Sequence, residues 1–160
     1  MLWYTHVTIG VAAGLAVIPA SASAKETIIA ASVSAVAALL PDIDTPHSKL
    51  GKRQSIASRA INLFFGHRGV MHSLVGCLAV LFLFKTISPN SIQYLSRYIG
   101  IGYISHILAD MLNPAGIPLL WPIRKRFRIP LIRTGGLAEK MMFAIAAFFI
   151  ATKIEKLFVF

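Results

Sequence analysis

The sequence predicts an all-α fold, a polytopic membrane bundle of about five helices that residues 1–160 form as a single domain. Apolar side chains make up 56% of the chain and charged side chains only 14%, and the mean hydropathy is +0.71. A soluble domain carries about 25% charged residues. The composition therefore excludes an ordinary soluble domain and indicates a multi-pass membrane protein.

The first predicted helix covers residues 7–24, behind Thr5 as a potential N-cap. Its 18 residues would span roughly 27 Å at about 1.5 Å per residue, enough to cross a bilayer. A secretory signal peptide is the alternative, because Ala20-Ser21-Ala22 resembles a cleavage site. The absence of Lys and Arg before the run favours a membrane helix.

The other apolar runs predict four further helices. Residues 27–40 form a short second helix rich in Ala and Ser, which ends at Pro41. Residues 70–87 and 92–112 form the third and fourth helices, separated by a tight turn at 88–91. Glu139 opens the last helix. These runs predict a chain that crosses the membrane in alternating directions.

Basic residues concentrate in two loops, which hold ten of the sixteen Lys and Arg residues, between positions 49 and 68 and between 124 and 133. The positive-inside rule places both loops in the cytoplasm and the turn at 88–91 outside. The basic residues behind the net charge of +10 then set the membrane topology and contact anionic membrane lipids, so no specific nucleic acid partner is expected. The single cysteine, Cys77, excludes a disulfide framework and a zinc-thiolate site.

Alternating helices would bring most acidic and imidazole side chains to one membrane face, the cytoplasmic one. The chain has three Asp, three Glu and five His, and this face would collect all the Asp, four His and one Glu. The candidate metal ligands are His6, Asp42, Asp44, His67, His72, His106, Asp110 and Glu139. His106 and Asp110, four residues apart, share one helix face, and Gly102 on the same stripe would leave room for a metal ion, a partner side chain or a substrate.

Imidazoles and carboxylates without a thiolate suit zinc in a catalytic setting, or manganese. Eight candidates exceed the ligands of one tetrahedral ion, so we expect two or three divalent ions. Such ions share a hydroxide nucleophile in ester and phosphoester hydrolysis. Asp42 or Asp44 would act as general base, Asp110 as ligand or as the group that orients His106, and Arg68 would hold a substrate phosphate.

Several motifs together resemble the YdjM-type family of bacterial inner-membrane, metal-dependent hydrolases. The matching stretches are Thr5-His6, Leu40-Pro41-Asp42-Ile43-Asp44, Gly66-His67-Arg68-Gly69 with His72-Ser73, residues 102–110, and Pro114-Ala115-Gly116 followed by residues 118–122. The family looks distantly similar to zinc-dependent phospholipases C and single-strand nucleases, which are all-helical enzymes with a trinuclear zinc cluster. The resemblance implies hydrolysis of a phosphodiester or of an ester in a lipid-like substrate.

Two alternative functions fit the sequence less well. A protein that binds or transports divalent metal would use the same ligands, but transporters place them near the bilayer midplane, whereas these lie at helix ends. A lipid phosphatase of the Ser-Arg-x5-His type does not fit, because eight residues separate Arg97 from His106. The sequence therefore favours the hydrolase.

Overall fold

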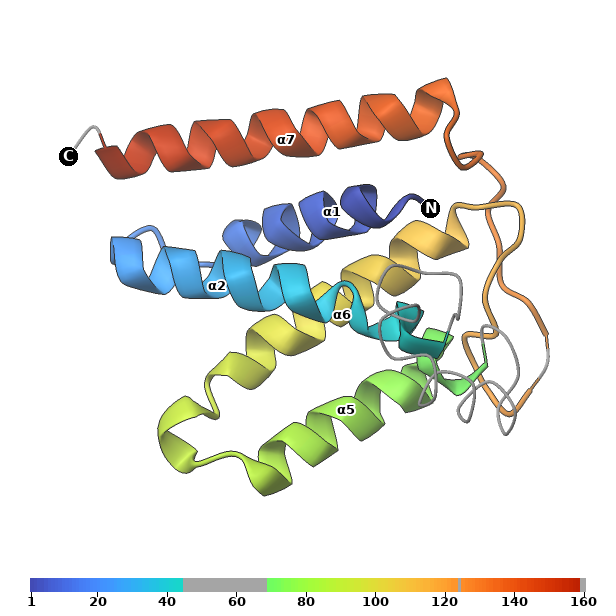
Figure 1. Ribbon diagram of the computed structural model, residues 1–160, viewed down its shortest axis with the longest axis horizontal. Coiled ribbons are helices and arrows are strands. Elements are labelled where there is room, and N and C mark those ends of the chain that lie inside the picture. The colour runs from blue at the N-terminus through green and yellow to red at the C-terminus, as the bar shows by residue number, and fades with distance from the viewer. Residues whose placement is uncertain (45–68, 124, 159–160) are drawn as a thin grey trace.

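The computed structural model describes residues 1–44, 69–123 and 125–158, and this part of the chain is helical. Its α-helices are α1, α2, α5, α6 and α7, which span Trp3–Ala16, Ala24–Ala37, Leu74–Ile87, Leu95–Met111 and Leu137–Phe158 (Figure 1). Three 3-10 turns lie between them: η1 (Leu40–Asp44), η2 (Val70–His72) and η3 (Asn90–Ile92). The all-α prediction is confirmed for these residues, whose only β pairing is one isolated bridge.

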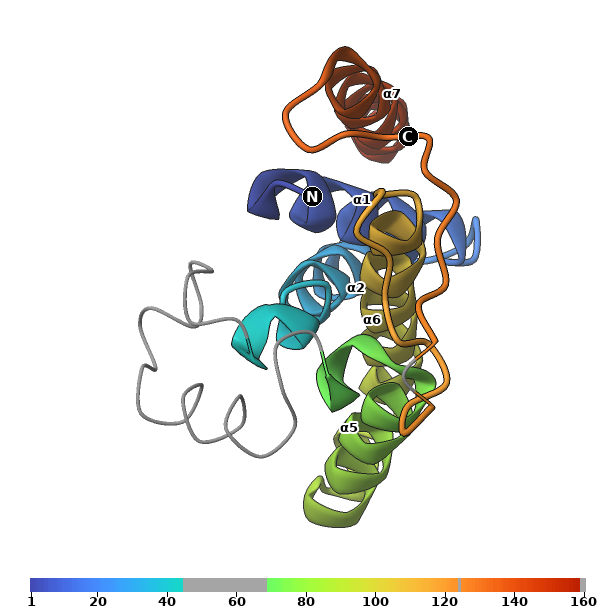
Figure 2. The same ribbon diagram turned by 90° about the vertical axis from the view of Figure 1, so that its right-hand side faces the viewer.

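Helix α1 lies in the middle of the bundle. It packs against α2, α6 and α7, while α6 also packs against α2 and α5. Two perpendicular views place α7 at one edge and α5 at the other (Figure 1, Figure 2). Because the chain alternates direction, the starts of α1, α5 and α7 lie at the same end as the C-terminal ends of α2 and α6 (Figure 1). This shared end faces the viewer in Figure 2.

Small residues allow α1, α2 and α6 to approach closely. A Cβ atom on Gly10 would lie 2.6 Å from Cβ of Ala38, and a Cβ atom on Gly102 would overlap the backbone oxygen of Ser34. Such contacts are common between membrane helices, where apolar burial gives little driving force for association. Gly102 therefore makes room for α2, so that of the three expected occupants a packing partner, and neither an ion nor a substrate, lies there.

The helix boundaries differ from those that hydropathy predicts. Helix α1 begins four residues early, with Leu2 at the N-cap, so Thr5 is a buried residue inside the helix and its predicted role as N-cap is wrong. Helix α2 begins at Ala24 because Ser23 and Glu26 form a capping box. The predicted third helix is divided into η2 and α5, since Ser73 caps the start of α5.

The connection between α6 and α7 folds back over the end of α6. Ile117 of this connection forms an antiparallel bridge with Phe127 and joins the core cluster of Cys77, Tyr103 and Ile107. Further along, the Ile129 N–H donates to the Met111 carbonyl over 2.7 Å. The connection thus satisfies carbonyl groups that the end of α6 leaves open.

Within the described residues, one segment is long and apolar enough to cross a membrane. It covers 20 residues, Ala24–Ile43, whereas the apolar helix α5 is shorter. Large apolar side chains also point outward from α5 and α7; Phe82 is 71% exposed and Phe148 is 72% exposed. Exposed apolar surface of this kind marks contact with lipid or with a partner. The number of membrane spans stays a prediction.

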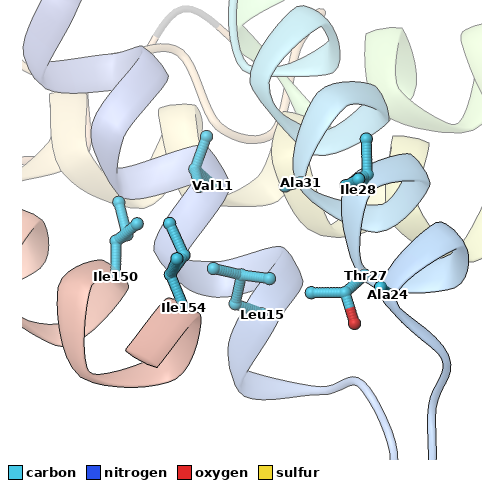
Figure 3. Close-up of a pocket in the computed structure, with 8 residues that line it drawn as sticks. All are labelled: Val11, Leu15, Ala24, Thr27, Ile28, Ala31, Ile150 and Ile154. Atoms are coloured by element: carbon cyan, nitrogen blue, oxygen red, sulfur yellow. The ribbon is translucent and has the colours of Figure 1, made fainter. Parts of the chain in front are cut away.

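An apolar groove of about 210 Å³ lies between α1, α2 and α7 (Figure 3). Val11 and Leu15 of α1 form its floor between Ile28 of α2 and Ile154 of α7. These residues belong to the second half of α1 and α7 and to the first half of α2. The groove is therefore remote from the end at which the metal-binding candidates gather.

Candidate metal centre

Five side chains that could hold a metal ion meet at the shared end of the bundle, and we call them the His/Asp cluster. They are His6 from α1, Asp42 from η1, His72 from η2, and His106 and Asp110 from α6. Asp42 is 19% exposed, and the other four are at most 1% exposed. Buried ionisable groups in a membrane protein need partners, so this arrangement makes the cluster a candidate functional site.

Asp110 lies at the centre of the cluster. Its Oδ1 atom is 3.3 Å from Nε2 of His6 and 2.8 Å from the α-amino nitrogen of Met1. Its Oδ2 atom is 3.8 Å from Nε2 of both His72 and His106. One carboxylate therefore faces three imidazole rings, which come from three different elements.

Asp42 closes the cluster on its partly exposed side. Its Oδ1 atom is 3.7 Å from Nε2 of His72 and 4.0 Å from Nε2 of His106. Two donors on one tetrahedral zinc ion, each at about 2.0–2.2 Å from the metal, are roughly 3.3–3.6 Å apart. The separations in the cluster are of this size or slightly larger, so the donors are spaced to surround an ion.

His106 is oriented as a metal ligand. Its Nδ1 lies 2.7 Å from the carbonyl oxygen of Ala38. A carbonyl only accepts hydrogen bonds, so Nδ1 carries the proton and the neutral ring presents a lone pair at Nε2. Nε2 is buried, makes no hydrogen bond within the described part of the chain, and faces the carboxylates of Asp42 and Asp110. A lone pair that faces two anions fits a bound cation between them.

The donor atoms form two groups, each within 4.8 Å: His6 with His106 and Asp110, and Asp42 with His72 and His106. The rings of His6 and His106 are stacked, with centroids 3.8 Å apart. Since Nε2 of His106 can bind only one ion, the described donors would hold one ion with ligands from both groups, or two ions that divide the donors between them.

Contacts outside the cluster hold His72 in place. The Tyr103 hydroxyl donates to the Met71 carbonyl over 2.5 Å, and Ser73 Oγ donates to the Val70 carbonyl over 2.6 Å. The same Ser73 oxygen accepts from the Gly76 N–H and so caps α5. The cap and the tyrosine together fix η2 against α6.

Glu139 is the one remaining predicted ligand whose side chain the structure describes, and it does not join the cluster. Glu139 is buried, but its oxygens accept hydrogen bonds from the backbone N–H groups of Leu2, at 2.6 Å, and Gly135, at 2.5 Å. Its carboxylate instead holds the backbone segments that precede α1 and α7, and Glu139 belongs to neither donor group among the described residues. The side chain of Asp44, and all of His67 and Arg68, lie outside the described residues.

Sequence reasoning missed two groups that contact the cluster. The Ala38 carbonyl orients His106, and the Met1 α-amino group binds Asp110. Neither has a signal in the sequence, because one is a backbone atom and the other depends on how α1 packs against α6. Tyr103, within the motif at residues 102–110, was available as a signal, since a buried Tyr hydroxyl usually finds a partner.

Comparisons with known proteins place the chain in a family. Residues 1–160 match the family described as YdjM inner membrane protein. "Inner membrane protein YdjM" of Escherichia coli is 50% identical over 98 residues, which are 59% of this chain and 50% of that protein. The Shigella flexneri protein of the same name shows the same figures. The chain thus spans about half the length of these two relatives.

A Bacillus subtilis relative, "Uncharacterized protein YvsG", is 36% identical over 120 residues, or 74% of each chain. No solved structure matches this chain. The family match covers every residue that contributes to the His/Asp cluster. The chain belongs to the YdjM family of inner membrane proteins.

Proposed function

We propose that this inner membrane protein is a metal-dependent hydrolase that cleaves an ester or phosphoester bond of a lipid-like substrate. The observation that supports it most is the geometry of His106, whose Nε2 lone pair is fixed by the Ala38 carbonyl and faces Asp42 and Asp110. A purely structural histidine would satisfy both ring nitrogens with hydrogen bonds.

The ligand types fit hydrolytic chemistry. Imidazoles and carboxylates without thiolates suit zinc or manganese. A divalent ion held here would supply Lewis acidity, which polarises the scissile bond and activates water. The described donors suit one or two ions; the two or three expected from the sequence would also use Asp44 and His67.

The two described carboxylates would have different roles. Asp110 is buried and surrounded by three imidazoles, which suits a ligand or a bridge. Asp42 is the more exposed of the two, and we assign to it the general base that accepts the proton of the attacking water. The electron pair of the broken bond then goes to the leaving oxygen. Asp44 is the other candidate base, and Arg68 would hold a substrate phosphate.

The site would lie at the cytoplasmic face of the inner membrane. The described basic residues Lys125, Arg126, Arg128 and Arg133 are in the connection whose backbone is hydrogen-bonded to Met111 and Leu112 at the end of α6. The positive-inside rule assigns such a face to the cytoplasm. Water would reach the site from that side, and the substrate would come from the inner leaflet.

A hydrolysis assay tests the proposal. Wild type, Asp42→Asn and Glu26→Gln would be compared on phospholipids and soluble phosphodiesters, with zinc or manganese added. We expect metal-dependent cleavage that Asp42→Asn lowers by about 100-fold or more, as loss of a general base does. Glu26 caps the remote end of α2, so Glu26→Gln should retain activity.

The contradicting result is equally specific. If no ester in the panel is cleaved, while liposomes containing a metal-sensitive dye take up zinc in a manner that depends on His106 and Asp110, the protein is a divalent-metal transporter. The hydrolase proposal then fails.

A further inference from the structure

A second apolar groove, of about 400 Å³, runs beside the His/Asp cluster between α1, α6 and α7. Its lining includes Ile9 and Ala13 of α1, Leu108 of α6 and Met142 of α7, together with Leu112 and Ile129 of the α6–α7 connection. This volume is in the range of ligand sites. We propose that the groove holds one acyl chain of an anionic phospholipid of the inner membrane.

The groove and the cluster are neighbours on α6. Ser105 and Ala109 line the groove, and each immediately precedes a cluster residue, His106 or Asp110. Successive residues of a helix differ by about 100° in direction. An acyl chain in the groove and a headgroup ester at the cluster therefore contact adjacent faces of the same two turns of α6.

The side chains around the groove are apolar and exposed at the protein surface. Leu108 is 56% exposed, and Met141 and Ile145, on the neighbouring part of α7, are 56% and 68% exposed. In an inner membrane protein such side chains contact lipid tails. A lipid chain can then enter the groove sideways without crossing water.

The basic residues of the α6–α7 connection indicate which lipid headgroup the site would accept. Lys125, Arg126, Arg128 and Arg133 flank Ile129 along the chain, and all four are exposed. Among the described residues, none of the four pairs with a carboxylate; Arg126 and Arg128 donate to the carbonyls of Ala115 and Pro114. Exposed cations on both sides of Ile129, which lines the groove, complement a lipid with a net negative headgroup.

This inference rests on the proposed function only in naming the lipid as substrate; the binding itself needs no hydrolysis. The test uses the full chain in liposomes that contain phosphatidylglycerol with a photoactivatable group on one acyl chain. After illumination, mass spectrometry locates the cross-linked peptides. We expect cross-links in α1, in the second half of α6 and at the start of α7, and fewer with phosphatidylcholine carrying the same group.

A matched pair of variants adds a control. Ala13→Phe fills this groove, and Ala31→Phe fills the remote groove of Figure 3. Ala13→Phe should lower cross-linking to α6 by about ten-fold, which corresponds to lost contact with about two methylene groups. Ala31→Phe should leave it unchanged, and both should bind the same amount of metal. If Ala13→Phe does not fold, Met142→Trp closes the groove from α7.

The outcomes separate the two proposals. Cross-linking that follows these variants in a protein without esterase activity supports the groove and contradicts the hydrolase. Phospholipid hydrolysis that Ala13→Phe leaves unchanged, with no cross-links to α6, overturns the groove alone. Equal cross-linking of phosphatidylglycerol and phosphatidylcholine overturns the choice of an anionic lipid.

Discussion

The carbonyl of Ala38 fixes the imidazole of His106, because the hydrogen bond of 2.7 Å to Nδ1 aims Nε2 into the His/Asp cluster. Ala38 follows α2 and His106 belongs to α6, so the ligand's orientation depends on the separation of these two helices. The geometry of the candidate metal site is thereby linked to helix packing.

Gly102→Ala should disturb the packing of α2 against α6 that orients His106. The added Cβ would overlap the Ser34 backbone oxygen and lie 2.9 Å from Cβ of Ala37, so α2 must shift. Overpacking of this kind costs about 1–3 kcal/mol of unfolding free energy. We expect a lower melting temperature in detergent and weaker zinc binding. Gly100→Ala is the control, since its Cβ would lie 3.5 Å from a Leu81 side-chain carbon; equal effects of both changes would contradict the account.

Tyr103→Phe should weaken the hold on His72. The variant removes the hydroxyl that donates to the Met71 carbonyl in η2, an interaction worth about 0.5–1.5 kcal/mol. Competition with a fluorescent chelator should show lower zinc affinity, and the free energy of unfolding should fall by no more than this amount. Tyr4→Phe, at a residue 38% exposed, should bind zinc like wild type. An unchanged affinity for Tyr103→Phe would show that η2 is fixed by other contacts.

Asn90→Cys should report the membrane topology. In a Cys77→Ala background, this exposed residue of η3 is expected outside the cell. An impermeant thiol reagent added to intact cells should label it and should not label Lys125→Cys. The reverse pattern would place the His/Asp cluster on the extracytoplasmic side.

Much of the fold followed from the sequence, because apolar runs and their polar ends are local features. Alternating helix direction placed His6, His106 and Asp110 at one end, and the structure brings them together. The start of α2 could also have been predicted, since Ser23 and Glu26 carry the spacing of a capping box. Hydropathy alone did not predict this helix start.

The remainder depended on tertiary contacts. Whether Glu139 would bind a metal or backbone N–H groups is decided by the turn at Gly135 and by Leu2, which are far apart in sequence. The space at Gly102 was open to interpretation as room for an ion, because the sequence of α6 does not predict its packing partner, Ser34 of α2. A small residue indicates that another element packs closely against it, but it does not identify that element.

Metal content is the most direct test of the central claim, that the His/Asp cluster holds a divalent ion. Protein purified without chelator would be analysed by inductively coupled plasma mass spectrometry, as wild type, His106→Ala and Ser105→Ala. We expect at least one zinc or manganese ion per chain in wild type and Ser105→Ala, and a loss of at least one ion in His106→Ala. Wild type that contains no transition metal, even after reconstitution, or His106→Ala with the full content, would contradict it.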